Sequence, residues 1–209
     1  LPEVDALFGV PQVEQYHPEI DTGRHVLMTM QLAAEEGCDA QVIFALLLHD
    51  LGKALTPVEQ LPRHHGHEHS GVALIRAVCV RLKVPKKYAE LAVLVGRWHL
   101  QVHRAMELRP GTLLELLERC DGLRRPERFA QMLTACEMDK RGRKGLQQRP
   151  YPQRDYLLAA LAAVNAVDFA SIDHDLESGK LKAEAFRSLR LDKLKTFQRK
   201  QRQSERDDG

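Results

Sequence analysis

Apolar residues recur every three to four positions through most of the first two thirds of the chain, and short segments rich in glycine, proline and histidine interrupt them. This spacing is typical of amphipathic helices, and glycine or proline marks where they end. The pattern therefore predicts a series of helices with no internal repeat. The expected ranges are Gly23–Glu36, Ala40–Lys53, Ser70–Leu82, Lys86–His103, Pro110–Leu123, Pro126–Gly142 and Gln153–Val167, followed by a last helix after Gly179.

The segment Ala40–Lys53 differs from its neighbours. Its residues from Val42 to Leu48 are apolar on every side, as expected of a helix that crosses the centre of a domain. Its polar residues His49 and Asp50 come in the last turn. Because buried polar groups need partners, this pair marks the end of the helix as a candidate site.

Composition favours an all-α fold. Aromatic residues make up 5% of the chain, and the 44% hydrophobic content comes largely from Leu, Ala and Val. A β-sandwich or barrel usually recruits more β-branched and aromatic residues. The longest apolar run, Tyr156–Val164, is far shorter than the roughly 20 residues that a membrane helix needs, so we expect no membrane association.

The cysteines indicate the cellular compartment of the chain, and its first residue indicates whether it is part of a longer protein. The four cysteines lie far apart without a CxxC pair, and no secretory segment is found. We therefore expect reduced thiols and a cytoplasmic location. Because the chain begins at Leu1 without an initiator methionine, we expect it to be part of a longer protein.

Charge limits the way in which this chain can bind nucleic acid. The 31 Lys+Arg nearly balance the 29 Asp+Glu, which excludes binding through a uniformly basic surface. Positive charge is concentrated in a turn with Arg141, Arg143 and Lys144 and in the segment Lys180–Arg206. The turn is a candidate RNA contact, and the segment is either a solvated helix face or an RNA-contacting one.

Eight of the ten histidines lie between His25 and His103. A mixed set of imidazole and carboxylate groups without thiolate favours Ni, Mn, Co, Fe or Mg over structural zinc. His49 and Asp50 would point about 100° apart on a helix, so both can reach one ion only between their two directions. His25, on the preceding antiparallel helix, is the expected third ligand.

The order of these residues resembles a known family. His25, then His49-Asp50 within Leu-Leu-His-Asp-Leu-Gly-Lys, then Asp121 is similar to the H…HD…D pattern of the HD superfamily of metal-dependent phosphohydrolases. The resemblance runs from Leu1 to about Tyr151. The flanking strings look like the HD domain of bacterial CCA-adding tRNA nucleotidyltransferases; they are His17-Pro18-Glu19, Asp21-Thr22-Gly23-Arg24-His25, Pro62-Arg63-His64-His65-Gly66-His67 and Glu137-Met138-Asp139 with Arg141-Gly142-Arg143.

The resemblance implies an all-α HD-domain helical bundle over residues 1–150 and a helical extension with a basic tail over 151–209. It also implies that the chain binds a divalent metal ion, and it implies which residues hold that ion. The implied ligands are His25, His49, Asp50 and Asp121, with His67 and His99 binding a second metal or the phosphate. Asp50 and His49 would be catalytic, with Asp50 as the general base, and Lys53, Arg63 and His64 would present positive charge to a phosphate.

Other polar residues nearby have simpler interpretations. His67 and His99 are otherwise a loop histidine and a core-edge histidine, and His64, His65, His69 and His103 are as well explained as solvated or capping side chains. Asp139 and Arg143 stand four residues apart, which is typical of an ordinary ion pair along a helix.

The implied function is hydrolysis of 2′,3′-cyclic nucleotides, 2′-nucleotides and small phosphoesters, linked to maturation and repair of the tRNA 3′ end. The implied partner is an N-terminal nucleotidyltransferase head. The Gly-Ser and paired-carboxylate element of that head is not found here, and Asp173-His174-Asp175 does not match it, so this chain alone is not expected to add nucleotides. The alternatives are a non-catalytic module that positions tRNA and an HD hydrolase for other nucleotides.

Overall fold

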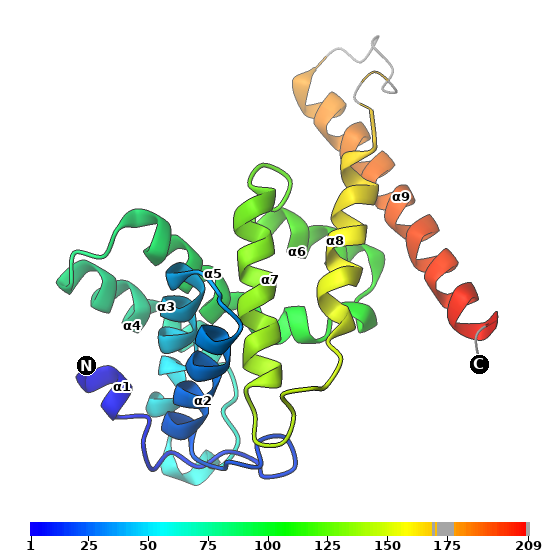
Figure 1. The fold of residues 1–209 in the computed structure, drawn as a ribbon. Helices are drawn as coiled ribbons and strands as arrows, with labels where there is room; N and C mark the ends of the chain where they lie inside the picture. Colours follow the sequence, from blue (N-terminus) through cyan, green and yellow to red (C-terminus); the bar gives the residue numbers. More distant parts are fainter. Residues whose placement is uncertain (169, 171–177, 208–209) are drawn as a thin grey trace. The chain divides into compact units, whose positions relative to one another are not determined.

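The computed structural model describes residues 1–168, 170 and 178–207, with side chains described up to residue 203. Asp173-His174-Asp175 lies outside the described residues. The all-α prediction is confirmed, since the described residues form helices and no β-strand. The helices shown in Figure 1 are α1 (Pro2–Asp5), α2 (Thr22–Glu35), α3 (Ala40–Leu48), η1 (Leu51–Leu55), η2 (Val58–Gln60), α4 (His67–Arg81), α5 (Lys86–His103), η3 (Ala105–Glu107), α6 (Pro110–Arg119), α7 (Pro126–Arg141), α8 (Pro152–Asn165) and α9 (Gly179–Asp207).

Two of the helix boundaries that differ from the sequence-based expectation affect the candidate site. The helix expected over Ala40–Lys53 ends at Leu48, and a separate 3₁₀ helix, η1, follows Asp50. His49 and Asp50 therefore lie at a junction of two elements. Helix α4 begins at His67 and not at Ser70, after Gly66 takes a left-handed conformation with φ of 75°. His67 thus lies in the first turn of a helix.

The described chain divides into two compact units. The first contains Leu1–His103 and Glu127–Arg154, and the second contains Arg104–Pro126 and Asp155–Gly209. This division differs from the boundary expected at residue 150. The physical reason is that α6, from the middle of the chain, packs against α9 from its end.

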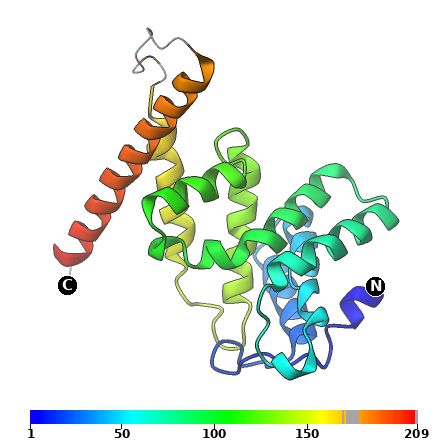
Figure 2. The same ribbon diagram turned by 180° about the vertical axis from the view of Figure 1, so that it is seen from behind.

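The first unit is built around α3. This helix packs against α2 on one side and α5 on another, and α4 packs against both α5 and η1 (Figure 1). Figure 2 shows α4 and α5 from behind as an antiparallel pair. The core between them is apolar, with fully buried side chains that include Val26, Leu46, Leu48, Leu51, Ile75, Leu91 and Val95.

Glycines let three of these elements approach the end of α3 closely. A Cβ atom on Gly52 would lie 2.1 Å from the His67 carbonyl oxygen, and one on Gly71 would lie 3.0 Å from the Gly52 nitrogen. Gly96 on α5 faces Ile75 and the backbone of His49. Because these positions lack side chains, η1, α4 and α5 can bring their polar residues close to the HD pair.

The second unit includes the basic segment Lys180–Arg206. Leu194 on α9 is fully buried. The Gln198 amide nitrogen donates to the Leu108 carbonyl oxygen at 2.9 Å and to the Tyr156 hydroxyl at 2.7 Å. One face of this segment is therefore packed within the second unit, while most of its Lys and Arg residues are exposed.

Among the described residues, no helix combines the length and hydropathy that a membrane span requires.

We predict that Gly52→Ala destabilises the protein. The new methyl group would collide with the backbone of α4, which cannot move as a flexible side chain would, and the expected cost is about 1–3 kcal/mol. Thermal unfolding followed by circular dichroism measures this. Gly111→Ala is the matched control, because nothing lies within 4 Å of its Cβ position. Equal melting temperatures for the two variants would contradict the prediction.

Candidate metal centre

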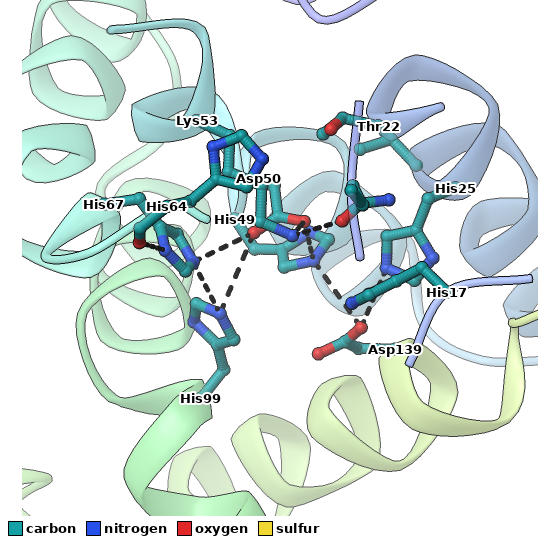
Figure 3. Close-up of polar contacts among 12 residues, drawn as sticks. His17, Thr22, His25, His49, Asp50, Lys53, His64, His67, His99 and Asp139 are labelled. Atoms are coloured by element: carbon teal, nitrogen blue, oxygen red, sulfur yellow. Dashed lines mark hydrogen bonds and ion pairs between the residues drawn. The ribbon is translucent and has the colours of Figure 1, made fainter. Parts of the chain in front are cut away.

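The structure gathers histidine and aspartate side chains from separate elements into two buried groups (Figure 3). We call them site A, formed by His25, His49 and Asp139, and site B, formed by Asp50, His67 and His99. Within each group the potential ligand atoms all lie within 4.8 Å of one another. The helices supply these residues in turn: α2 gives His25, the α3–η1 junction gives His49 and Asp50, α4 gives His67, α5 gives His99 and α7 gives Asp139.

In site A, one oxygen of Asp139 faces both histidines. Its Oδ1 atom lies 2.9 Å from His25 Nε2 and 3.7 Å from His49 Nε2. His49 donates its Nδ1 proton to the Leu46 carbonyl oxygen at 2.7 Å. Among the described residues, His49 Nε2 forms no hydrogen bond despite full burial. This nitrogen is therefore directed at the shared space with Asp139.

In site B, two ring nitrogens face each other. His67 Nδ1 donates to the His64 carbonyl oxygen at 2.8 Å, and His99 Nδ1 donates to the Val95 carbonyl oxygen at 3.0 Å. Because a carbonyl only accepts, both Nδ1 atoms carry protons, and in the neutral rings both Nε2 atoms have lone pairs. The two Nε2 atoms are 3.3 Å apart, and Asp50 Oδ1 lies 3.3 Å from His67 Nε2.

Such a convergence of lone pairs is repulsive unless a cation or a proton compensates it. Burial lowers the pKa of His99 well below 6.5, which disfavours a proton on that ring. Nitrogen and carboxylate ligands with their outer atoms held by hydrogen bonds are what a divalent metal ion requires. The side chains of site B therefore fit a metal ion.

Asp50 lies between the two sites. Its Oδ2 atom is 3.2 Å from His49 Nε2 of site A and 2.7 Å from Lys53 Nζ, whereas its Oδ1 atom faces site B. The side chain is about 1% exposed. Asp50 therefore contacts a residue of site A with one oxygen and a residue of site B with the other.

The electrostatics of the centre depend on its buried carboxylates. Burial opposes the charged form of His49, but the carboxylates of Asp50 and Asp139 outweigh it and raise the pKa of His49 to about 10. Burial likewise opposes ionisation of both carboxyl groups, yet His49 with Lys53 lowers the pKa of Asp50 and His103 with His25 lowers the pKa of Asp139. With no metal ion bound, a proton on His49 thus provides the positive charge.

A protein-family model described as "HD domain" matches residues 22–161. The chain belongs to the HD domain family. The resemblance found in the sequence is thereby confirmed, and all six residues of sites A and B lie within the matched range.

Curated relatives of this HD domain are named "Multifunctional CCA protein". One from Thioalkalivibrio sulfidiphilus is 52% identical over 195 residues, which is 93% of this chain and 48% of the relative. One from Ectopseudomonas mendocina is 53% identical over 197 residues, 94% of this chain and 47% of the relative. One from Chromobacterium violaceum is 56% identical over 172 residues, 82% of this chain and 42% of the relative. The chain spans about half the length of these relatives. No solved structure matched it.

The structure does not place Asp121 in the metal centre of the HD domain. Asp121 follows α6 in the second unit, with φ of 56°, and its carboxylate pairs with Arg124 at 2.6 Å and Arg125 at 3.4 Å. Asp139 is the aspartate that lies beside His25 and His49. The pattern requires only an aspartate on a later helix, and sequence spacing alone does not choose between the two.

A signal for Asp139 is nevertheless present in the sequence. On α7 the buried positions include Phe129, Met132 and Cys136, and Asp139 continues that spacing of three to four residues. A carboxylate on the apolar face of a helix is costly to bury without a partner. The expected ion pair between Asp139 and Arg143 is present, with Nη2 3.7 Å from Oδ1, but His25 Nε2 lies closer to the same oxygen, at 2.9 Å.

The three residues expected to contact a phosphate, Lys53, Arg63 and His64, lie in surroundings that differ from one another. Lys53 is buried, pairs with Asp50 and donates to the Gln12 side-chain oxygen at 2.5 Å. His64 uses both ring nitrogens within the protein, with Thr56 Oγ1 at 2.8 Å and the Pro11 carbonyl oxygen at 2.9 Å. Arg63 is exposed. Lys53 is thus the one of the three whose side chain pairs with a carboxylate of the centre, and His64 contacts site B through its main-chain carbonyl oxygen.

Two of the three candidate RNA contacts in the turn after α7 instead form contacts within the protein. Arg141 bonds Glu36, Glu137 and the Gln147 carbonyl oxygen. Arg143 is buried and donates to the Tyr16 carbonyl oxygen at 2.9 Å. Both guanidinium groups stabilise the fold of the first unit, so we do not retain them as RNA contacts. Lys144 is exposed.

We predict that Asp139→Asn removes metal binding at site A, whereas Asp121→Asn does not. The amide cannot supply the anionic oxygen that faces His25 and His49, and the loss should exceed the roughly 10–100-fold typical of losing an outer partner of a ligand. Equilibrium dialysis against Co²⁺ with elemental analysis measures the affinity of each variant. Weaker binding by the Asp121 variant alone would restore the sequence-based assignment.

We further predict that metal binding near neutral pH releases protons. His49, with its pKa at about 10, is protonated in the metal-free protein, and it must lose that proton to become a ligand. Because protons compete with the metal, affinity should rise about tenfold per pH unit for each proton displaced between about pH 6 and pH 8. Calorimetry in buffers of different ionisation enthalpy counts the protons. Affinity independent of pH would contradict this.

Proposed function

We propose that this chain is a metal-dependent phosphohydrolase whose centre holds two neighbouring divalent cations, one in site A and one in site B, with the Asp50 carboxylate shared between them. The observation that supports this most directly is the convergence of Asp50 Oδ1 with the Nε2 atoms of His67 and His99, while Asp50 Oδ2 faces His49. Neighbouring cation sites of this kind are typical of enzymes that cleave phosphoesters.

Divalent cations held there would supply an activated water molecule and neutralise charge that builds on the phosphoryl oxygens. The residues of the chain have distinct tasks around them. His25, His49, His67 and His99 would hold the ions through ring nitrogens, and Asp139 and Asp50 would supply anionic oxygens. Lys53 carries the positive charge nearest to Asp50 and is the candidate contact for a substrate phosphate.

Asp50 is better suited to bind metal than to act as the general base expected from the sequence. Its Oδ2 atom is paired with Lys53, and its pKa is held well below the usual value by His49 and Lys53 against the effect of burial. A carboxylate that binds protons so weakly removes one from water poorly. We therefore assign it the role of shared ligand.

The substrate class follows from the family resemblance and from the relatives. The relatives' name, "Multifunctional CCA protein", and their similarity over most of this chain support a role at the tRNA 3′ end. We propose 2′,3′-cyclic nucleotides, 2′-nucleotides and small phosphoesters as substrates, with a nucleotidyltransferase head as partner in a longer protein. We propose one of Ni, Mn, Co, Fe and Mg as the divalent metal.

The main alternative is a non-catalytic module that positions tRNA. The exposed Lys and Arg side chains of α9 favour some contact with RNA. A module kept only for RNA binding has no need of six converging buried ligands, which are costly to hold without a cation. The two roles are compatible, and the assay below separates them.

We predict that the chain hydrolyses 2′,3′-cyclic AMP when loaded with a divalent metal, and that Asp50→Asn lowers turnover about 100-fold or more, since the neutral amide cannot serve both ions. Turnover is measured with 2′,3′-cyclic AMP, 2′-AMP and para-nitrophenyl phosphate over the five metals. His65→Ala is the matched control, because that histidine is exposed. Circular dichroism confirms that each variant is folded.

Two outcomes would overturn parts of this proposal. Equal turnover by the parent and the Asp50 variant would remove Asp50 from the machinery. A parent protein that binds metal but hydrolyses none of the three esters would favour the tRNA-positioning alternative, which a gel shift with tRNA at low and high salt then tests.

A further inference from the structure

We propose that His103, held by Tyr151, is a positioning residue that fixes the carboxylate of Asp139 so that only one of its oxygens faces site A. This inference rests on the proposed metal centre and assigns a role to two residues outside it. The sequence-based interpretation of His103 was a solvated or capping side chain.

The two oxygens of Asp139 have separate partners. Oδ1 faces His25 and His49, as described above. Oδ2 accepts a hydrogen bond from His103 Nε2 at 2.7 Å. The Asp139 and His103 side chains are about 3% and 9% exposed, so water does not compete for this bond.

The Asp139 carboxylate determines which nitrogen of His103 carries the proton, and Tyr151 is a partner for the other nitrogen. A carboxylate can only accept, so His103 Nε2 must be the protonated nitrogen. Its Nδ1 atom lies 2.8 Å from the Tyr151 hydroxyl and accepts from it in the neutral ring. The buried hydroxyl thus donates to His103, and His103 donates to Asp139. Gln153 adds a hydrogen bond to the His103 carbonyl oxygen at 3.3 Å.

The bond from His103 matters because Asp139 has a competing partner. The Arg143 Nη2 atom lies 3.7 Å from Asp139 Oδ1, the same oxygen that faces site A. A carboxylate free to rotate would be drawn toward this guanidinium and away from His49. By holding Oδ2, His103 limits that rotation and keeps Oδ1 between the two histidines.

Site B provides an internal reference for this role. Its histidines are held by main-chain carbonyl oxygens, and among the described residues His103 and Tyr151 make no hydrogen bond to Asp50, His67 or His99. The His103 ring does meet the His99 ring edge-on, with the centroids 6.0 Å apart. Loss of His103 should therefore weaken site A, where it holds a ligand by a hydrogen bond, more than site B. A residue needed only for overall stability would affect both equally.

The test compares His103→Gln with His103→Asn in the full chain. The Gln amide nitrogen reaches the position of Nε2 and can donate to Asp139, whereas the shorter Asn amide cannot. Co²⁺ titrations followed by calorimetry and by visible absorption report the affinity and the ligand geometry of each step. His65→Asn is the control for an exposed histidine.

We expect His103→Asn to weaken by about 10–100-fold the same Co²⁺ step that Asp139→Asn abolishes, to shift its absorption band and to change the other step much less. His103→Gln should keep most of the affinity, and Tyr151→Phe should show a smaller loss. Two tight steps with unchanged spectra in His103→Asn would overturn the inference, as would equal weakening of both steps. A parent chain that binds no Co²⁺ would instead refute the metal centre itself.

Discussion

Two carboxylates and four imidazoles lie buried together at the end of α3, and an arrangement of this kind is stable only where charges and lone pairs are compensated. Asp50 and Asp139 are each nearly inaccessible to solvent, yet their pKa values are lowered because histidines and Lys53 surround them against the effect of burial. Helices α2, α4, α5 and α7 and the α3–η1 junction each contribute a side chain to this compensation. The fold of that unit can be understood as the packing that brings these groups together.

The separation of the HD pair is the structural feature on which the proposed chemistry depends. Because α3 ends at Leu48, His49 and Asp50 are not successive residues of one regular helix. His49 turns toward Asp139 and Asp50 toward His67 and His99, so one dipeptide serves two sites. The glycine contact between η1 and α4 allows this, since Gly52 lies against the backbone of His67.

The surroundings of the centre differ from one site to the other. In site B, main-chain carbonyl oxygens hold the histidines, so their orientation is part of the helices themselves. In site A, Asp139 is held by a side chain, His103, from another helix. Backbone anchoring changes only with the fold, whereas side-chain anchoring can be altered by one substitution. A single substitution near site A should therefore change the orientation of its ligands more readily than a single substitution near site B.

Much of this protein follows from local sequence. Helical periodicity, the low aromatic content and the apolar run before His49 predicted an all-α fold with polar residues at the end of a buried helix, because these depend on neighbouring residues alone. The order His25, His49-Asp50 also indicated the family. Only the tertiary structure decided that Asp139 lies beside His25 and His49, that α6 packs with α9, and that Arg141 and Arg143 are engaged within the fold. These depend on which helices meet in space, and residues more than 100 positions apart, such as His25 and Asp139, come together through packing that no local pattern encodes.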